Sequence, residues 1–142
     1  MRNSAFVLAL IAAVAALPAA HAATVAYKAN MSGAAEVPPV QTAGKGTAQV
    51  NVDTATKGVS WRVDYSGLSG PATAAHIHCG AAPGTNAGVA VPLGQGPTAA
   101  SPMQGTGTMT DAQLAELQAG KCYVNVHTAA NKNGEIRGQL AP

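Results

Sequence analysis

The sequence has little charge and few aromatic side chains. Among its 142 residues, eight are Lys or Arg and six are Asp or Glu, and the eight cations are scattered along the chain. Phosphate binding requires several clustered Lys or Arg side chains, so we expect no nucleic-acid partner. A Gly-rich phosphate loop and a nucleophile turn are also missing, which argues against nucleotide binding and hydrolysis.

Long apolar runs are missing except at the N-terminus. There Arg2 precedes an apolar run from Ala5 to Leu17, and Ala20-His21-Ala22 supplies small residues around a cleavage site. This pattern is typical of a secretory signal peptide at residues 1–22, followed by one domain at residues 23–142. The run is short of the ~20 residues that a membrane-spanning helix needs. We therefore expect a periplasmic or secreted protein without a membrane span after cleavage, whose formal charge falls from +2 to +1 when Arg2 is removed.

Cysteine is scarce, with only Cys79 and Cys122. Two cysteines in an exported protein most often form one disulfide, because the compartment is oxidising; two unpaired thiols are the alternative. A disulfide that closes a loop of roughly forty residues contributes about 3–4 kcal/mol in the chain-entropy model.

What the chain does contain is a series of short segments with alternating apolar and polar residues. In the clearest one, Val59, Trp61, Val63 and Tyr65 share a face. Turn residues separate the segments, which predicts an all-β Greek-key sandwich. The expected strands are Val25–Met31, Gly46–Val52, Val59–Tyr65, Ala72–His78, Val89–Leu93, Gly105–Thr110, Lys121–His127 and Glu135–Leu140, with Gly94–Gly105 as a loop that exposes Met103.

One segment favours a helix instead. Residues 111–119 are rich in helix formers, and Thr110 with Gln113 matches a capping box. Gly120 falls where a C-terminal cap belongs. We expect one short helix that leads into the strand of Cys122.

Three of the four histidines lie in two of the expected strands. His76 and His78 share one face of the first strand, opposite Ile77 and Cys79, and His127 lies on the polar face of the second strand, opposite Val124 and Val126. If the apolar faces point into the core, both cysteines point inward and all three histidines point outward. The pattern predicts a three-histidine site on the surface of a disulfide-linked sandwich.

The sequence resembles the CHRD domain, a family named from chordin that also occurs singly in exported bacterial proteins. The resemblance rests on Glu36-Val37-Pro38-Pro39-Val40, on Ala75-His76-Ile77-His78-x-Gly80, and on Tyr123 to Thr128 followed by Gly134 to Gln139. It implies an immunoglobulin-like or superoxide-dismutase-like sandwich and leaves the biochemical role open. Cys79 is not an expected fixed feature of the motif.

The histidines suggest a transition-metal site, with copper favoured and zinc possible. Two imidazoles about 7 Å apart on a strand can reach one ion, and a third from a neighbouring strand completes the site. Glu36 and Asn125 are candidates to orient the histidines by hydrogen-bonding the ring nitrogen that does not bind the metal. Met31, Met103 and Met109 are weaker candidates for a Cu(I) ligand.

Two alternatives stay open. In the first, the histidines hydrogen-bond loop carbonyls, Asn125 or Glu135. The protein is then an interaction module that binds an unidentified protein or matrix partner through a sheet face or through the Glu36–Val40 and Gly80–Gly88 loops. In the second, His-x-His with a later His resembles the copper half of copper/zinc superoxide dismutases. A copper-only enzyme would then use Arg137 to guide anions, although an exposed pair with Glu135 is the plainer expectation for that arginine.

Overall fold

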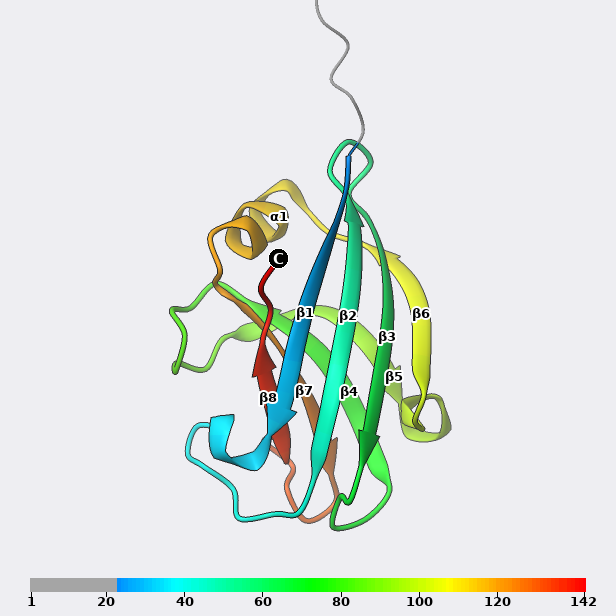
Figure 1. Cartoon of the computed structure of the whole chain (residues 1–142), viewed down its shortest axis with the longest axis vertical. Coiled ribbons are helices and arrows are strands. Elements are labelled where there is room, and N and C mark those ends of the chain that lie inside the picture. The colour runs from blue at the N-terminus through cyan, green and yellow to red at the C-terminus, as the bar shows by residue number, and fades with distance from the viewer. Residues whose placement is uncertain (1–22) are drawn as a thin grey trace, which may run out of the picture.

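Eight strands and one short α-helix make up residues 23–142, which are the residues that the computed structural model describes (Figure 1). The predicted signal peptide, residues 1–22, lies outside them. The elements are β1 (Thr24–Ser32), β2 (Lys45–Asp53), β3 (Gly58–Ser66), β4 (Ala72–Cys79), β5 (Gly88–Gln95), β6 (Met103–Thr108), α1 (Asp111–Gln118), β7 (Cys122–Thr128) and β8 (Ile136–Gln139), with short 3₁₀ turns at Gly33–Ala35 and Gly96–Ala99.

All eight predicted strands form, because alternating side chains place one apolar row on the core side of each strand. In β3, Val59, Trp61 and Val63 are buried, whereas Arg62 is exposed. The largest error in the predicted bounds concerns the loop at Gly94–Gly105. Its ends belong to β5 and β6, and Met103 is only 1% exposed because it begins β6 with its side chain in the core.

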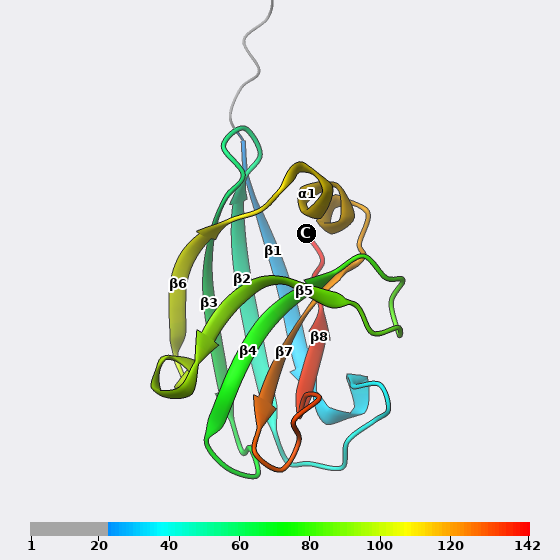
Figure 2. The same ribbon diagram turned by 180° about the vertical axis from the view of Figure 1, so that it is seen from behind.

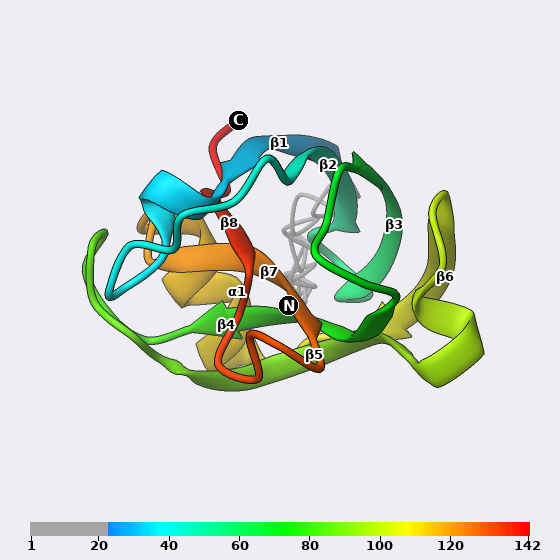
Figure 3. The ribbon, with the colours of Figure 1, turned by 90° about the horizontal axis from the view of Figure 1, so that it is seen from below.

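The strands form one antiparallel sheet in the order β5-β4-β7-β8-β1-β2-β3-β6. β4, β5 and β6 follow one another in the chain, while β3 lies beside β6 and β7 beside β4, which is the Greek-key arrangement that the sequence predicts. Seen from below, the sheet curls round until β5 and β6, its two edge strands, approach each other (Figure 3). The nearly closed sheet encloses a sandwich-like core.

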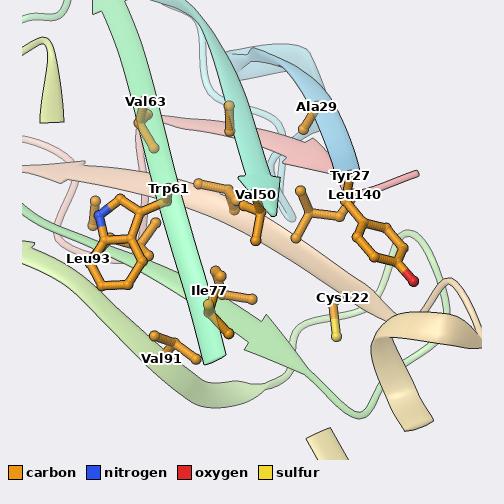
Figure 4. Close-up of a cluster of buried hydrophobic side chains, with 14 of the residues drawn as sticks. Tyr27, Ala29, Val50, Trp61, Val63, Ile77, Val91, Leu93, Cys122 and Leu140 are labelled. Carbon is orange, nitrogen blue, oxygen red and sulfur yellow. The ribbon is translucent and has the colours of Figure 1, made fainter. Parts of the chain in front are cut away.

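Aliphatic side chains fill this core, with Trp61 as its largest member (Figure 4). The indole packs on Gly105 of β6, where an added Cβ would lie 2.5 Å from the ring. Met31, Met103 and Met109 are all at most 3% exposed and belong to the same cluster. Their thioethers are therefore used in packing.

The predicted helix forms with its predicted capping box. The Thr110 side chain accepts from the Gln113 amide, and the Gln113 side chain accepts from the Thr110 amide. Gly120 follows the helix with a φ of 71°, a conformation that glycine adopts without strain. The helix carries the chain across the end of the sandwich from β6 to β7 (Figure 1).

A disulfide joins Cys79 to Cys122, as expected. The two residues are direct partners in the β4–β7 ladder. Within residues 23–142, no helix combines the length and apolar character needed to cross a membrane.

Candidate metal centre

The histidines lie on the outer face of the sheet where β4, β7 and β8 run side by side (Figure 2). His76 pairs with Asn125, and His78 pairs with Tyr123. On the other side of β7, Asn125 pairs with Arg137. This register places polar side chains from three neighbouring strands in one layer, because alternate residues of each strand point to the same face.

One nitrogen from each of His76, His78 and His127 lies within 4.8 Å of the others. The predicted convergence of the two strand segments is therefore present, although they are separated by about fifty residues in the chain. Among the described residues this is the one group of three or more His, Cys, Asp or Glu side chains placed to share a metal ion.

The site is more enclosed than a surface site. His78 is 8% and His127 is 9% exposed, and His76 is half-buried. The strand parity is right, since Ile77 and Val124 point into the core, but the outer face is itself covered. Residues 80–88 and 129–134 lie against it through the carbonyls of Ala87 and Lys132, and every residue of β7 is buried. The expectation of a surface site was wrong on this point.

His127 is fixed by the loop that covers it. Its Nδ1 lies 3.0 Å from the carbonyl oxygen of Lys132. Because a carbonyl only accepts, Nδ1 carries the proton and Nε2 presents a lone pair. That Nε2 accepts from Nδ1 of His76 at 3.0 Å. Two of the three rings thus meet directly, nitrogen to nitrogen.

His78 is fixed by the other covering loop. Its Nδ1 donates to the carbonyl oxygen of Ala87 at 2.8 Å, and its ring stacks on Tyr123 with centroids 4.9 Å apart. The Tyr123 hydroxyl accepts from the amide of Ala87 at 3.1 Å. Nε2 of His78 lies 3.1 Å from Oδ1 of Asn125.

Arg137 holds the same loop from β8. Its guanidinium lies 3.3 Å from the centroid of the Tyr123 ring and donates to the Thr85 carbonyl and the Asn86 side chain. The exposed pair of Arg137 with Glu135 does not form, because both residues are buried and each has other partners. At 2% exposure, Arg137 is also not placed to guide anions from solvent.

Glu36 lies beneath the loops with one oxygen unpaired. It is 5% exposed, and its Oε1 has no hydrogen-bond partner. Burial raises the pKa of its carboxyl to about 7, although the Arg137 charge and the Val37 amide oppose the shift. Glu36 makes no hydrogen bond to a histidine, and its Oε1 lies beside Gly134, close to Asn125.

A buried carboxylate that sequence reasoning did not single out as a hub is Glu135. It accepts hydrogen bonds from Thr42, Ser69, Thr128 and Asn131. Burial alone would raise its pKa, but hydrogen bonds from Ser69, Thr42 and Thr128 lower it to about 2. The available signal was the polar residues in three connections, before β2, between β3 and β4, and between β7 and β8, which no periodicity joins together.

The imidazoles of His76 and His127 are weakened as bases in this setting. Burial lowers the pKa of His76 to about 4, and the nearby His127 and His78 add to the effect. Burial also lowers the pKa of His127, although the hydrogen bond to the Lys132 carbonyl opposes the shift. Neutral imidazole is the form that ligates metals, so both rings are ready to bind at neutral pH.

The nitrogen positions approach those of a metal site. Bonds of about 2.0–2.1 Å place the ligand nitrogens about 3.4–3.6 Å apart at tetrahedral or trigonal angles. The His76–His127 pair, at 3.0 Å, would open slightly, and the widest pair would close by about 1 Å. Backbone carbonyls already orient two of the rings, as in known metal sites.

Fold and site together define an antiparallel Greek-key β-sandwich that carries a polar layer with three histidines on one outer face. The family model of the CHRD domain matches residues 27–140, and the chain belongs to the CHRD family. Comparison with curated proteins and with solved structures found no match. Family membership and the disulfide are both consistent with an extracellular location.

Proposed function

We propose that the protein is exported to the periplasm or beyond and binds one transition-metal ion through His76, His78 and His127. The observation that carries this proposal is the convergence of three ring nitrogens within 4.8 Å. Two of the rings donate from Nδ1 to backbone carbonyls, so Nε2 is the nitrogen with a lone pair. To act as a third ligand through Nδ1, His76 would give up its hydrogen bond to His127 and carry its proton on Nε2.

Copper is the metal that this ligand set favours, with zinc second. Imidazole accepts either ion, and the intrinsic affinity order places Cu²⁺ above Zn²⁺. Cysteine does not contribute a thiolate, because both cysteines are in the disulfide. The half-buried edge of His76 is the side from which an ion enters and a fourth ligand binds.

The test is the metal content of protein purified from the periplasm, measured by mass spectrometry and followed by titration with Cu(I), Cu(II) and Zn(II). We expect about one ion per chain in the wild type and none in the His76→Ala/His78→Ala/His127→Ala variant. A matched control replaces three exposed residues on the opposite half of the sheet, Lys28, Gln49 and Gln104, with alanine. Equal metal content in all three proteins, or none in the wild type after reconstitution, overturns the proposal.

A second candidate is an interaction module whose histidines are structural. It is favoured by one contact, the hydrogen bond from the Asn86 side chain to the Val37 carbonyl at 2.9 Å, which joins the two loops proposed to meet a partner. His78 and Arg137 tie the same loop to the sheet. This candidate predicts that added metal leaves the melting temperature unchanged and that substitutions in both loops abolish capture of a partner.

Superoxide dismutation is a further possibility if copper binds. The experiment is superoxide turnover by the copper-loaded wild type, with the triple alanine variant as blank. Arg137 does not supply anion attraction from its buried position, so a turnover that depends weakly on ionic strength is the expected signature if the activity exists.

A further inference from the structure

Asn125 lies at the centre of the histidine cluster. It pairs with His76 across the β4–β7 ladder, and it is two residues from His127 on the same face of β7. Its Oδ1 lies 3.1 Å from Nε2 of His78, and Asn125 is only 2% exposed. All three histidines are therefore its neighbours on this face, and one of them is in direct contact.

The contact between Asn125 and His78 brings two acceptors together. Nδ1 of His78 lies 2.8 Å from the Ala87 carbonyl oxygen, so Nδ1 carries the proton and Nε2 of the neutral ring presents a lone pair. The amide is oriented by its other side, where Nδ2 donates to the Asn133 carbonyl at 3.4 Å. A reversed amide would place oxygen against oxygen there. Oδ1 therefore faces Nε2, and a cation between these two atoms makes the buried contact favourable.

The same contact argues against the orienting role that the sequence suggests for Asn125. An orienting residue hydrogen-bonds the ring nitrogen that does not bind the metal, and for His78 the Ala87 carbonyl already occupies that position. Asn125 instead faces Nε2, which is the nitrogen with the lone pair. An ion bound to Nε2 of His78 would thus meet Oδ1 of Asn125 as well.

The distance between Oδ1 and Nε2 fits a shared ion. With metal–ligand bonds of about 2.0–2.2 Å, a separation of 3.1 Å corresponds to an angle of about 90–100° at the metal. Nδ1 of His76 and Nε2 of His127, which are 3.0 Å apart, give an angle in the same range. Angles near 90° are those of tetragonal sites with nitrogen and oxygen ligands, which favour Cu(II) over the tetrahedral sites of zinc.

We propose that Oδ1 of Asn125 is an oxygen ligand of the metal ion, in addition to the three imidazoles, and that it makes the centre selective for Cu(II). This inference rests on the proposed metal site and deepens it by assigning a ligand that determines metal specificity. An amide oxygen is a hard ligand, so it stabilises Cu(II) and contributes little to the binding of the softer Cu(I). The half-buried edge of His76 stays open for an additional ligand from solvent.

The test compares the wild type with Asn125→Leu, which removes the oxygen and keeps the approximate size of the side chain. Both proteins are titrated with Cu(II) and with Cu(I), each in competition with a chelator of known affinity. We expect Cu(II) binding to weaken about 10-fold or more and Cu(I) binding to change less than about 3-fold. Asn51→Leu, the same substitution on the outer face of β2, is the matched control and should change neither affinity.

Rescue and spectroscopy separate a ligand from a structural residue. Asn125→Asp keeps an oxygen at this position and should bind Cu(II) at least as tightly as the wild type. The electron paramagnetic resonance spectrum of bound Cu(II) should change in Asn125→Leu, because one ligand atom is lost, and should not change in Asn51→Leu. Asn125→Ala is the second variant should the leucine variant fail to fold, with native content checked by circular dichroism.

Selective loss of Cu(II) affinity in Asn125→Leu, with recovery in Asn125→Asp, supports the inference. Three results overturn it while leaving the three-histidine site intact: equal losses for Cu(I) and Cu(II), no recovery in Asn125→Asp, or an unchanged Cu(II) affinity and spectrum in Asn125→Leu. No copper binding by the wild type overturns both proposals.

Discussion

At the scale of single residues, the centre contains two titratable groups whose pKa values move in opposite directions. Burial lowers the pKa of the His76 imidazole to about 4 and raises that of the Glu36 carboxyl to about 7. Both shifts disfavour charge in the covered polar layer. At neutral pH His76 is therefore neutral and Glu36 is only partly ionised.

These shifts predict opposing pH dependences of stability. Between about pH 4 and 6.5 the unfolded chain binds a proton at His76 that the folded protein does not, so stability falls as the pH falls. Between about pH 4.5 and 7 the folded protein keeps a proton on Glu36 that the unfolded chain loses, so stability falls as the pH rises. Each effect amounts to about 1–2 kcal/mol after allowance for partial solvent screening.

Urea unfolding from pH 4.5 to 7 of metal-free protein measures both effects. The wild type should gain some stability as the pH rises, because the lowered pKa values of His76 and His127 together outweigh the raised pKa of Glu36. Glu36→Gln should gain more than the wild type over this range, and His76→Gln should gain less. Parallel curves for the three proteins would show that neither group has a shifted pKa.

At the scale of elements, the loops rather than the strands decide how the centre is covered. Glu135, directly before β8, binds Thr42 before β2, Ser69 between β3 and β4, and Asn131 between β7 and β8. Three connections at one end of the sandwich thus share one carboxylate. The last of them carries Lys132, whose carbonyl fixes His127.

Replacing this carboxylate should affect both stability and the centre. In Glu135→Gln, the amide group faces the fixed donors from Ser69 and Asn131, so at least one hydrogen bond is lost in a fully buried site. We expect a loss of about 2–3 kcal/mol in the free energy of unfolding. Asp64→Asn, which disrupts an exposed pair with Arg62, should cost less than about 1 kcal/mol and serves as the control. Similar losses in the two variants would contradict the role of Glu135 as a hub.

At the scale of the whole molecule, the disulfide joins β4 to β7, the two strands that carry the three histidines. Cys79 and Cys122 are 43 residues apart, and the loop between them contains β5, β6 and α1. They are also the neighbours in sequence of His78 and Tyr123, whose rings stack.

Removal of the disulfide by Cys79→Ala/Cys122→Ala should lower the free energy of unfolding by about 3–4 kcal/mol in the chain-entropy model. Denaturant unfolding of wild-type and variant proteins, both without metal, gives the difference. Reduction of the wild type should reproduce the shift, and a reducing agent should leave the variant unchanged. A change below about 1 kcal/mol would show that the unfolded chain is not appreciably restrained by the bond.

The sequence predicts the sandwich and the shared face of His76 and His78 because both depend on local patterns, whereas the meeting of these histidines with His127 depends on the long-range pairing of β4 with β7. Alternation in β3, the capping box at Thr110 and the parity of His76 and His78 each follow from a few neighbouring residues. The burial of His78 and the hub at Glu135 do not, because they depend on where loops distant in the sequence come to rest. Asn125 was placed beside the histidines correctly, but its position in front of Nε2 depends on a rotamer that no pattern encodes.

The pairing of β4 with β7 also determines when the centre can exist during folding. A short turn joins β2 to β3, and residues 33–44 join β1 to β2, whereas His127 is 51 positions from His76 in the chain. A loop of this length loses conformational entropy when it closes, before the strand contacts can offset that loss. Such pairings therefore form late and slowly. A nascent chain therefore presents an isolated His-x-His pair, and the complete ligand set appears only when folding is nearly finished.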